Sequence, residues 1–240
     1  MYPLPFGQVV MKTSEPTSPR FYGRRKGRPL RRGMQALLNE MLPDLRFDVT
    51  RPLATQFGQA DNQQADLALE IGFGGGEHLA DLAEANPTVN YIGADPFVNG
   101  VASLLRHIQT RQLSNIRIWD DDVRLILPAL PLAGVSQVYI MFPDPWPKKR
   151  HAARRILQPE TMDVLAQLIR PSGHLVLASD EPTAKSWLLR TAISHPQFCW
   201  TARRPADWRQ RSPCLPATRY MAKAEQKSRQ PSWFIFERHE

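Results

Sequence analysis

Cysteine is scarce in this sequence, and no long apolar run occurs. Cys199 and Cys214 are the two cysteines among 240 residues, too few for a disulfide scaffold or a structural zinc site. No apolar stretch approaches the roughly 18 residues that would span a membrane. The N-terminus also lacks the basic segment followed by an apolar one that a secretory signal has. We therefore expect a cytoplasmic protein with reduced thiols, no membrane segment and no bound metal.

Positive charge is concentrated at the two ends of the chain. Residues 1–33 carry eight bases and one acid, residues 203–238 carry nine bases and three acids, and residues 61–142 carry ten acids and four bases. Basic blocks of this kind neutralise phosphates, so a nucleic acid is the expected partner and a solvated tail is the alternative. Residues 1–33 are also rich in Pro, Gly and Arg without hydrophobic periodicity. They predict a flexible RNA-binding arm before a single domain over residues 34–240.

Strand and helix patterns alternate after residue 66. Buried-strand runs occupy 67–72, 89–95, 115–119, 135–142, 173–179 and 233–236, and helical patterns occupy 76–85, 97–113, 161–169 and 184–193. This alternation predicts an α/β fold, a doubly wound and mostly parallel sheet with helices on both faces. Ligands bind such sheets at the carboxyl ends of the strands. The unusual residues of this sequence cluster at those predicted ends.

A glycine-rich turn follows the first predicted strand. Gly72, Gly74 and Gly76 let the backbone turn tightly and approach a ligand closely. A dinucleotide fingerprint would need a small sixth residue, but that position is Glu77, where a pyrophosphate would meet negative charge. The spacing, with Glu70 two residues before the first glycine, instead suits S-adenosylmethionine, and a plain strand-to-helix turn is the alternative.

Carboxylates end the next two predicted strands. Asp95 ends the second, where an acid accepts hydrogen bonds from ribose hydroxyls. Asp120, Asp121 and Asp122 end the third, where a carboxylate could hold the adenine amino group. Each alone is typical of a helix N-cap. Together with the glycine turn they predict a cofactor pocket.

The fourth predicted strand ends in the string FPDPWPKKRH, residues 142–151. Its alternating prolines restrict the backbone, so the loop should be stiff and should hold Asp144 and Trp146 in place. Lys148, Lys149 and Arg150 follow at once. A carboxylate, an aromatic ring and a basic run beside a cofactor are typical of a site where a base meets a methyl donor.

With these motifs the sequence resembles the bacterial tRNA (guanine-N7)-methyltransferases. The resemblance covers about residues 66–238 and rests on LEIGFGGGEHL, NYIGADPFVNGV, NIRIWDDD, MFPDPWPKKRHAARR, LVLASD and ATRY. It implies the seven-stranded class I methyltransferase sheet, S-adenosylmethionine as donor, and N7-methylguanosine at position 46 of the tRNA variable loop as product. It places cofactor contacts at Glu70, Asp95, Asp122 and Asp144, and RNA contacts at Lys148, Asp180, Thr218, Arg219, Tyr220 and Met221.

Three positions depart from the family pattern. Asp95 stands where the family usually has Glu, so the carboxylate is one methylene shorter. Ser179 replaces the usual Thr before Asp180. Met221 replaces the final Glu of the family's Thr-Arg/Lys-aromatic-Glu segment, which leaves the RNA site one carboxylate short.

The chemistry of guanine N7 indicates what the catalytic group must do. N7 carries an in-plane lone pair and no proton, so its attack needs no general base. Transfer moves positive charge onto the purine ring, which assigns Asp144 an electrostatic and orienting role, with Trp146 as loop support or stacking surface. We expect His151 at a backbone phosphate and His78 on the surface.

Three other functions fit parts of this pattern. An amino-group methyltransferase usually has Asp/Asn-Pro-Pro-aromatic, and Asp144-Pro145-Trp146 lacks the second proline. A small-molecule methyltransferase would have no use for two basic ends. An RNA-binding protein of the same fold with weak or lost catalysis is consistent with Met221. The sequence does not predict an oligomeric state.

Overall fold

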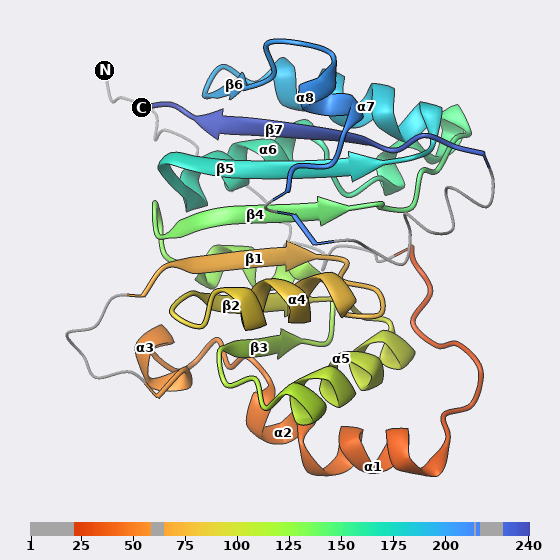
Figure 1. Ribbon diagram of the computed structural model, residues 1–240, viewed down its shortest axis with the longest axis vertical. Coiled ribbons are helices and arrows are strands. Elements are labelled where there is room, and N and C mark those ends of the chain that lie inside the picture. Colours follow the sequence, from red (N-terminus) through yellow and green to blue (C-terminus); the bar gives the residue numbers. More distant parts are fainter. Residues whose placement is uncertain (1–21, 59–64, 214, 217–227) are drawn as a thin grey trace, which may run out of the picture.

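The computed structural model describes residues 22–58, 65–213, 215–216 and 228–240. In this part of the chain seven strands form one sheet in the order β3-β2-β1-β4-β5-β7-β6 (Figure 1). The strands are β1 (Leu67–Ile71), β2 (Asn90–Ala94), β3 (Ile116–Trp119), β4 (Val135–Met141), β5 (Ile169–Ser179), β6 (Phe198–Trp200) and β7 (Ser232–Arg238).

Strands β1 to β5 are parallel, and β7 runs antiparallel between β5 and β6. In Figure 1 the arrow of β7 points left, whereas those of β1, β4 and β5 point right. The doubly wound, mostly parallel sheet is thus confirmed, with every predicted strand present. β6 has three residues, too short for a periodic pattern, and it was not predicted.

Helices connect the strands and cover both faces of the sheet. The α-helices are α1 (Arg32–Glu40), α2 (Leu42–Leu45), α3 (Leu53–Gln56), α4 (Glu77–Ala85), α5 (Val98–Arg111), α6 (Pro159–Leu168), α7 (Pro182–Ile193) and α8 (Ala206–Arg209). The 3-10 helices are η1 (Val123–Leu125), η2 (Leu127–Ala129) and η3 (Lys149–Arg154). None of these described helices is both long and apolar enough to cross a membrane.

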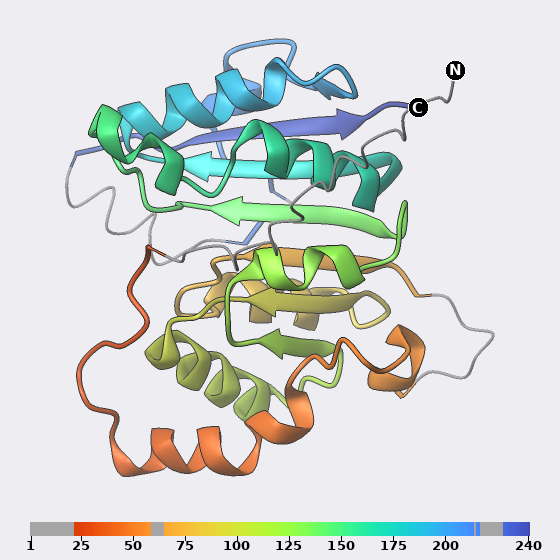
Figure 2. The same ribbon diagram turned by 180° about the vertical axis from the view of Figure 1, so that it is seen from behind.

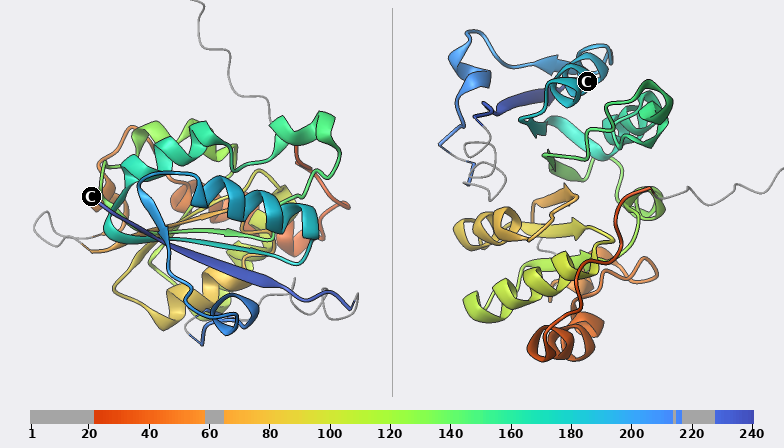
Figure 3. Two further views of the ribbon diagram at one scale, coloured as in Figure 1. Left: turned by 90° about the horizontal axis from the view of Figure 1, so that it is seen from above. Right: turned by 90° about the vertical axis from the view of Figure 1, so that its right-hand side faces the viewer.

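Two apolar layers hold the helices against the sheet. Leu79 of α4 and Leu104 of α5 are fully buried in one layer, and this layer also includes Leu37 of α1. Leu165 of α6 and Leu188 of α7 are buried in the other. Figure 2 shows α6 and α7 in front of the sheet, and the edge-on view in Figure 3 shows helices on both sides. The predicted helices therefore bury the faces that their periodicity indicated.

The carboxyl ends of β1 to β5 meet at one edge of the sheet. In Figure 1 the segment that precedes α1 runs along this edge. The helix α1 begins at Arg32, two residues before the predicted start of the domain at residue 34. The flexibility of the arm stays a prediction, and residues 1–21 lie outside the described part.

Candidate active site

The glycine turn joins β1 to α4 through left-handed backbone. Gly72, Gly74 and Gly76 have φ values of 77°, 58° and 80°, a region that glycine enters without steric penalty. A Cβ atom on Gly76 would lie 2.7 Å from the Cβ of Leu104, so α5 packs against the turn at a distance that only glycine allows. The shape of the turn is therefore fixed by its own backbone and by its packing against α5.

Asp95 links the end of β2 to this turn. Its carboxylate accepts a hydrogen bond from the backbone N–H of Gly74 at 2.8 Å and another from that of Phe97 at 2.9 Å. The side chain is buried, and this burial raises the pKa of Asp95 to about 6, with repulsion from Glu70 and Asp144 adding to the effect. Asp95 therefore lies within electrostatic reach of two more carboxylates, and a cation placed among them would be stabilised.

Asp122 is held by a neighbouring arginine at the start of η1. Its carboxylate accepts a hydrogen bond from the backbone N–H of Arg124 at 3.0 Å, which caps the helix, and its Oδ2 lies 2.5 Å from an Nη atom of the Arg124 guanidinium. Asp122 is 3% exposed. The pair presents a carboxylate of fixed orientation to the same space as Asp95.

The loop after β4 is strained at two positions. Phe142 and Trp146 have φ values of 52° and 40°, which typically cost about 1–3 kcal/mol each for residues other than glycine. Arg155 holds the loop, since its guanidinium donates to the carbonyl oxygen of Trp146 at 3.0 Å and to that of Pro145 at 3.3 Å. The same guanidinium lies 4.3 Å from the ring centre of Trp187 in α7. Arg155 therefore connects the loop to α7 and fixes its position.

These elements enclose one cavity of about 870 Å³. Gly72, Gly74, Asp95, Asp122 and Asp144 all line it, so the structure brings together residues predicted from four strand ends. Its walls come from the segments 22–28, 71–77, 94–103, 122–124, 142–146 and 154–156. The volume is ample for a nucleoside cofactor.

Five residues of the predicted arm form part of the cavity wall: Tyr22, Gly23, Arg24, Gly27 and Arg28. Asn99 of α5 holds this segment, accepting from the N–H of Gly27 at 2.7 Å and donating to the carbonyl oxygen of Arg28 at 2.8 Å. The backbone N–H of Val98 donates to the carbonyl oxygen of Arg25 at 3.0 Å. The arm therefore supplies part of the cavity wall in addition to positive charge. Its composition did not predict this structural role.

Glu70 and Gly76 were also predicted to contact the cofactor. Neither residue is part of the cavity lining. Oε2 of Glu70 lies 2.9 Å from Nδ1 of His78, and both side chains are buried. The expectation that His78 lies on the surface is wrong, because α4 turns this side chain inward beneath the glycine turn. The ring also makes a T-shaped contact with Tyr139.

Of the predicted RNA contacts, the two that the structure describes, Lys148 and Asp180, lie outside the cavity lining. Lys148 is exposed and precedes η3. Asp180 follows β5, and its carboxylate lies 3.7 Å from the guanidinium of Arg229. Thr218, Arg219, Tyr220 and Met221 lie outside the described residues. Their proposed roles rest on the resemblance.

Two contributors to the site were missed by sequence reasoning. Arg155 belongs to a basic run that favours RNA contacts, and no local signal marks it as the donor to the proline-rich loop. Asn99 lies within a helical pattern, and no local signal distinguishes a helical Asn that binds a distant backbone segment. Each role is defined by a tertiary contact.

Comparison with known proteins identifies the family of the chain. The family described as "Putative methyltransferase" matches residues 64–234. The tRNA (guanine-N(7)-)-methyltransferase of Rhodospirillum rubrum is 46% identical over 91% of this chain and 88% of its own length. The protein of that name from Paramagnetospirillum magneticum is 47% identical over 92% of this chain and 93% of its own.

Solved structures share the fold at low sequence identity. The 16S rRNA (adenine(1408)-N(1))-methyltransferase from Catenulisporales acidiphilia has a TM-score of 0.55 at 11% identity, covering 82% of this chain and 98% of that one. An rRNA methylase from Streptococcus thermophilus has a TM-score of 0.51 at 12% identity, covering 74% and 89%. These structures confirm the class I methyltransferase fold. On the strength of the sequence relatives, the chain belongs to the tRNA (guanine-N(7)-)-methyltransferase family.

Proposed function

We propose that this protein transfers the methyl group of S-adenosylmethionine to N7 of a guanosine in tRNA. The observation that carries this proposal is that the strained Asp144 loop and the glycine turn line one cavity. Family membership supports the same reaction. The resemblance of the sequence supports guanosine 46 of the variable loop as the target, and a tRNA substrate supports a cytoplasmic location.

The residues of the cavity suit a cofactor that carries positive charge and hydroxyl groups. Asp95 uses each carboxylate oxygen once for a backbone N–H, and each oxygen keeps a lone pair that can accept from a ribose hydroxyl. Glu77 and Asp144 add negative charge to the lining. S-adenosylmethionine supplies a methyl group on a cationic sulfur, which carboxylates placed nearby would stabilise.

Asp144 performs the electrostatic part of the reaction in this proposal. Its side chain is exposed at the cavity, at the end of β4. A fixed carboxylate there favours the purine ring as that ring becomes positive, and it removes no proton because N7 carries none. Arg155 fixes the loop that carries it. Alignment of N7 with the methyl carbon and sulfur by the whole site can contribute roughly 7 to 11 kcal/mol to lowering the barrier.

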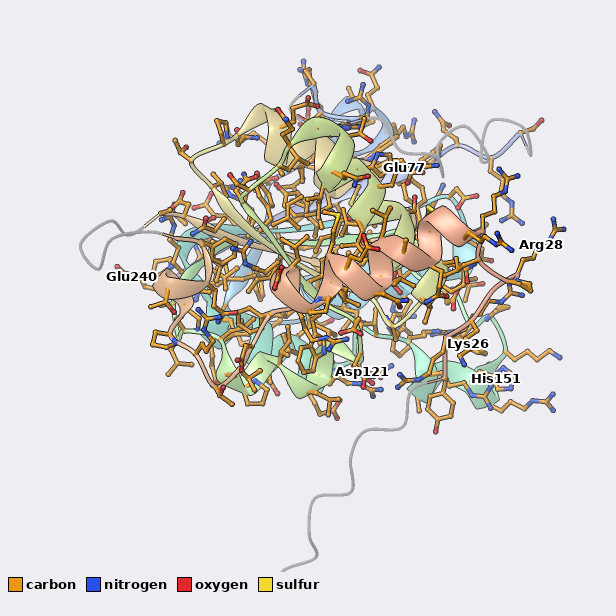
Figure 4. The ribbon with its side chains drawn as sticks, turned by 90° about the horizontal axis from the view of Figure 1, so that it is seen from below. Lys26, Arg28, Glu77, Asp121, His151 and Glu240 are labelled. Carbon is orange, nitrogen blue, oxygen red and sulfur yellow. The ribbon has the colours of Figure 1, made fainter. Side chains whose placement is uncertain are left out.

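Basic residues around the cavity mouth supply the RNA contacts. Lys26, Arg28 and His151 lie along the same edge of the molecule, on the right in Figure 4. This is the edge where the parallel strands end, and Arg28 also lines the cavity. We assign these residues, with Lys148, to contacts with phosphates.

The test is methylation of unmodified tRNA with isotope-labelled donor, followed by nucleoside mass spectrometry. We expect labelled N7-methylguanosine, and no label in a tRNA whose guanosine 46 is replaced by adenosine. Methylation at the exocyclic N2 of guanosine instead would indicate an amino-group enzyme. Binding of tRNA without any methylation would indicate the RNA-binding alternative.

A further inference from the structure

Two aromatic rings from distant parts of the chain contact one arginine at the cavity mouth. The guanidinium carbon of Arg154 lies 4.9 Å from the ring centre of Tyr22 and 5.0 Å from that of Trp146. All three residues line the cavity that also contains Asp144. Tyr22 is 39% exposed although it is a large aromatic residue. The two rings therefore already hold a planar cation beside the catalytic loop.

The reaction itself produces another planar cation. The lone pair of N7 forms a bond to the methyl carbon while the bond from that carbon to sulfur breaks and its electron pair stays on sulfur. The positive charge passes from sulfur to the purine ring, and no proton moves. Aromatic faces attract cations through their quadrupole, and a flat, delocalised cation adds stacking to that attraction.

We propose that Tyr22 and Trp146 form the binding site for the ring of the target guanine, and that Arg154 occupies this site until the base enters. This inference rests on the proposed function and names the base site within it. The attraction grows as the ring becomes positive, so the two aromatic rings bind the transition state and the methylated base more tightly than guanine. Arg154, displaced, becomes available to an RNA phosphate.

The backbone at Trp146 supports this role. Its φ of 40° is strained. Strain of this kind persists only where surrounding contacts impose the conformation, and such residues cluster at active sites and ligand-binding positions. His151 contacts the same ring in a T-shaped arrangement at 5.7 Å, and Arg155 binds its carbonyl oxygen. Trp146 is thus held by His151 and Arg155 independently of Arg154, rather than left as a loose surface side chain.

The test measures nucleotide binding without donor or tRNA. Calorimetry compares GMP with N7-methyl-GMP at slightly acidic pH, where the methylated ring keeps its N1 proton and its positive charge. We expect N7-methyl-GMP to bind the wild-type protein at least about tenfold more tightly than GMP. Tyr22→Ala and Trp146→Ala should each abolish the preference, whereas Tyr22→Phe should keep it because the ring face is retained.

The Arg154→Gln variant distinguishes two possible roles of Arg154. The side chain either occupies the base site while it is empty or itself binds the base. Removing the resident cation should raise the affinity for N7-methyl-GMP several-fold and weaken the binding of unmodified tRNA. Arg209→Gln is the matched control, because Arg209 lies 4.7 Å from the ring centre of Trp208 and neither residue lines the cavity. This change should leave the affinity for N7-methyl-GMP unaltered.

Equal binding of the two nucleotides, or a preference that survives both Tyr22→Ala and Trp146→Ala, would overturn the inference. If the wild-type protein methylates tRNA at guanine N7 and still shows no preference, the base site is wrong and the proposed function stands. If the preference is present and depends on the two rings while no methyl transfer occurs, the base site stands and the proposed function is wrong.

Discussion

Nδ1 of His78 lies 2.9 Å from Oε2 of Glu70 in a buried pair beneath the glycine turn. A carboxylate accepts hydrogen bonds, so Nδ1 of His78 carries the proton in this contact. Burial of a carboxylate is costly without a partner. The predicted contact of Glu70 with the cofactor stays a prediction, and in this structure the buried Glu70 carboxylate is paired with His78.

His78→Ala should therefore lower the free energy of unfolding by about 3 to 5 kcal/mol, because it leaves the Glu70 carboxylate buried without its partner. Chemical denaturation measures this. In a Glu70→Gln background the same substitution should cost less, since no charge is then left unpaired. Asp163→Ala is the control: it removes the exposed partner of His195 and should cost less than about 1 kcal/mol. Equal destabilisation by His78→Ala and Asp163→Ala would contradict a structural role for the buried pair.

The raised pKa of Asp95 predicts that donor binding depends on pH. Burial, the larger cause, raises this pKa to about 6 in the donor-free protein. The positively charged donor favours the ionised Asp95 carboxylate. Below that pH the donor must compete with protonation of this carboxylate, whereas above it the carboxylate is already ionised. Affinity should fall by up to about tenfold per pH unit below pH 6. Calorimetry across this range checks it, and Asp95→Asn should weaken binding and flatten the profile. An Asp95→Asn profile as steep as wild type would exclude Asp95 as the titrating group.

Arg155 lines the cavity, but it should affect turnover more than binding, because its guanidinium donates to two carbonyl oxygens of the strained loop. Removing a charged hydrogen-bond donor costs about 1.5 to 3 kcal/mol, so we expect Arg155→Gln to lower kcat by roughly 10- to 100-fold. The KM values for tRNA and donor should change little. Arg150→Gln, an exposed change in η3, should instead alter the salt dependence of tRNA binding. A raised KM with unchanged kcat in Arg155→Gln would assign Arg155 to substrate binding.

The N-terminal segment should have two separable roles. Deleting residues 1–21 should lower the salt dependence of tRNA binding by about 0.7 to 0.9 in log-log slope for each phosphate that the segment neutralises, with donor affinity unchanged. Deleting residues 1–31 should also weaken donor binding, because residues 22–28 line the cavity. Asn99→Ala, which removes both hydrogen bonds to this segment, should reproduce the donor defect without the salt effect. Full donor affinity after both the longer deletion and Asn99→Ala would remove the segment from the cofactor site.

The sequence predicted the parts of this site that are local. A glycine turn, carboxylates at strand ends and a proline-rich loop are contiguous patterns, and the parallel sheet brings Gly74, Asp95 and Asp144 to one edge. Contacts that depend on tertiary packing were not predictable in this way. The burial of His78 needs the turn between β1 and α4, and the hydrogen bonds of Asn99 need a chain segment about seventy residues away.

Single-turnover kinetics of Asp144→Asn test whether Asp144 stabilises positive charge on guanine during methyl transfer to N7. With unmodified tRNA and saturating labelled donor, we predict N7-methylguanosine as the product of both the wild-type protein and the variant. We also predict a rate constant lower by about 10- to 100-fold in the variant, which corresponds to about 1.5 to 3 kcal/mol of charge-assisted stabilisation, with a smaller loss of donor affinity. An unchanged rate constant, or methylation of guanosine at another atom, would refute this role for Asp144.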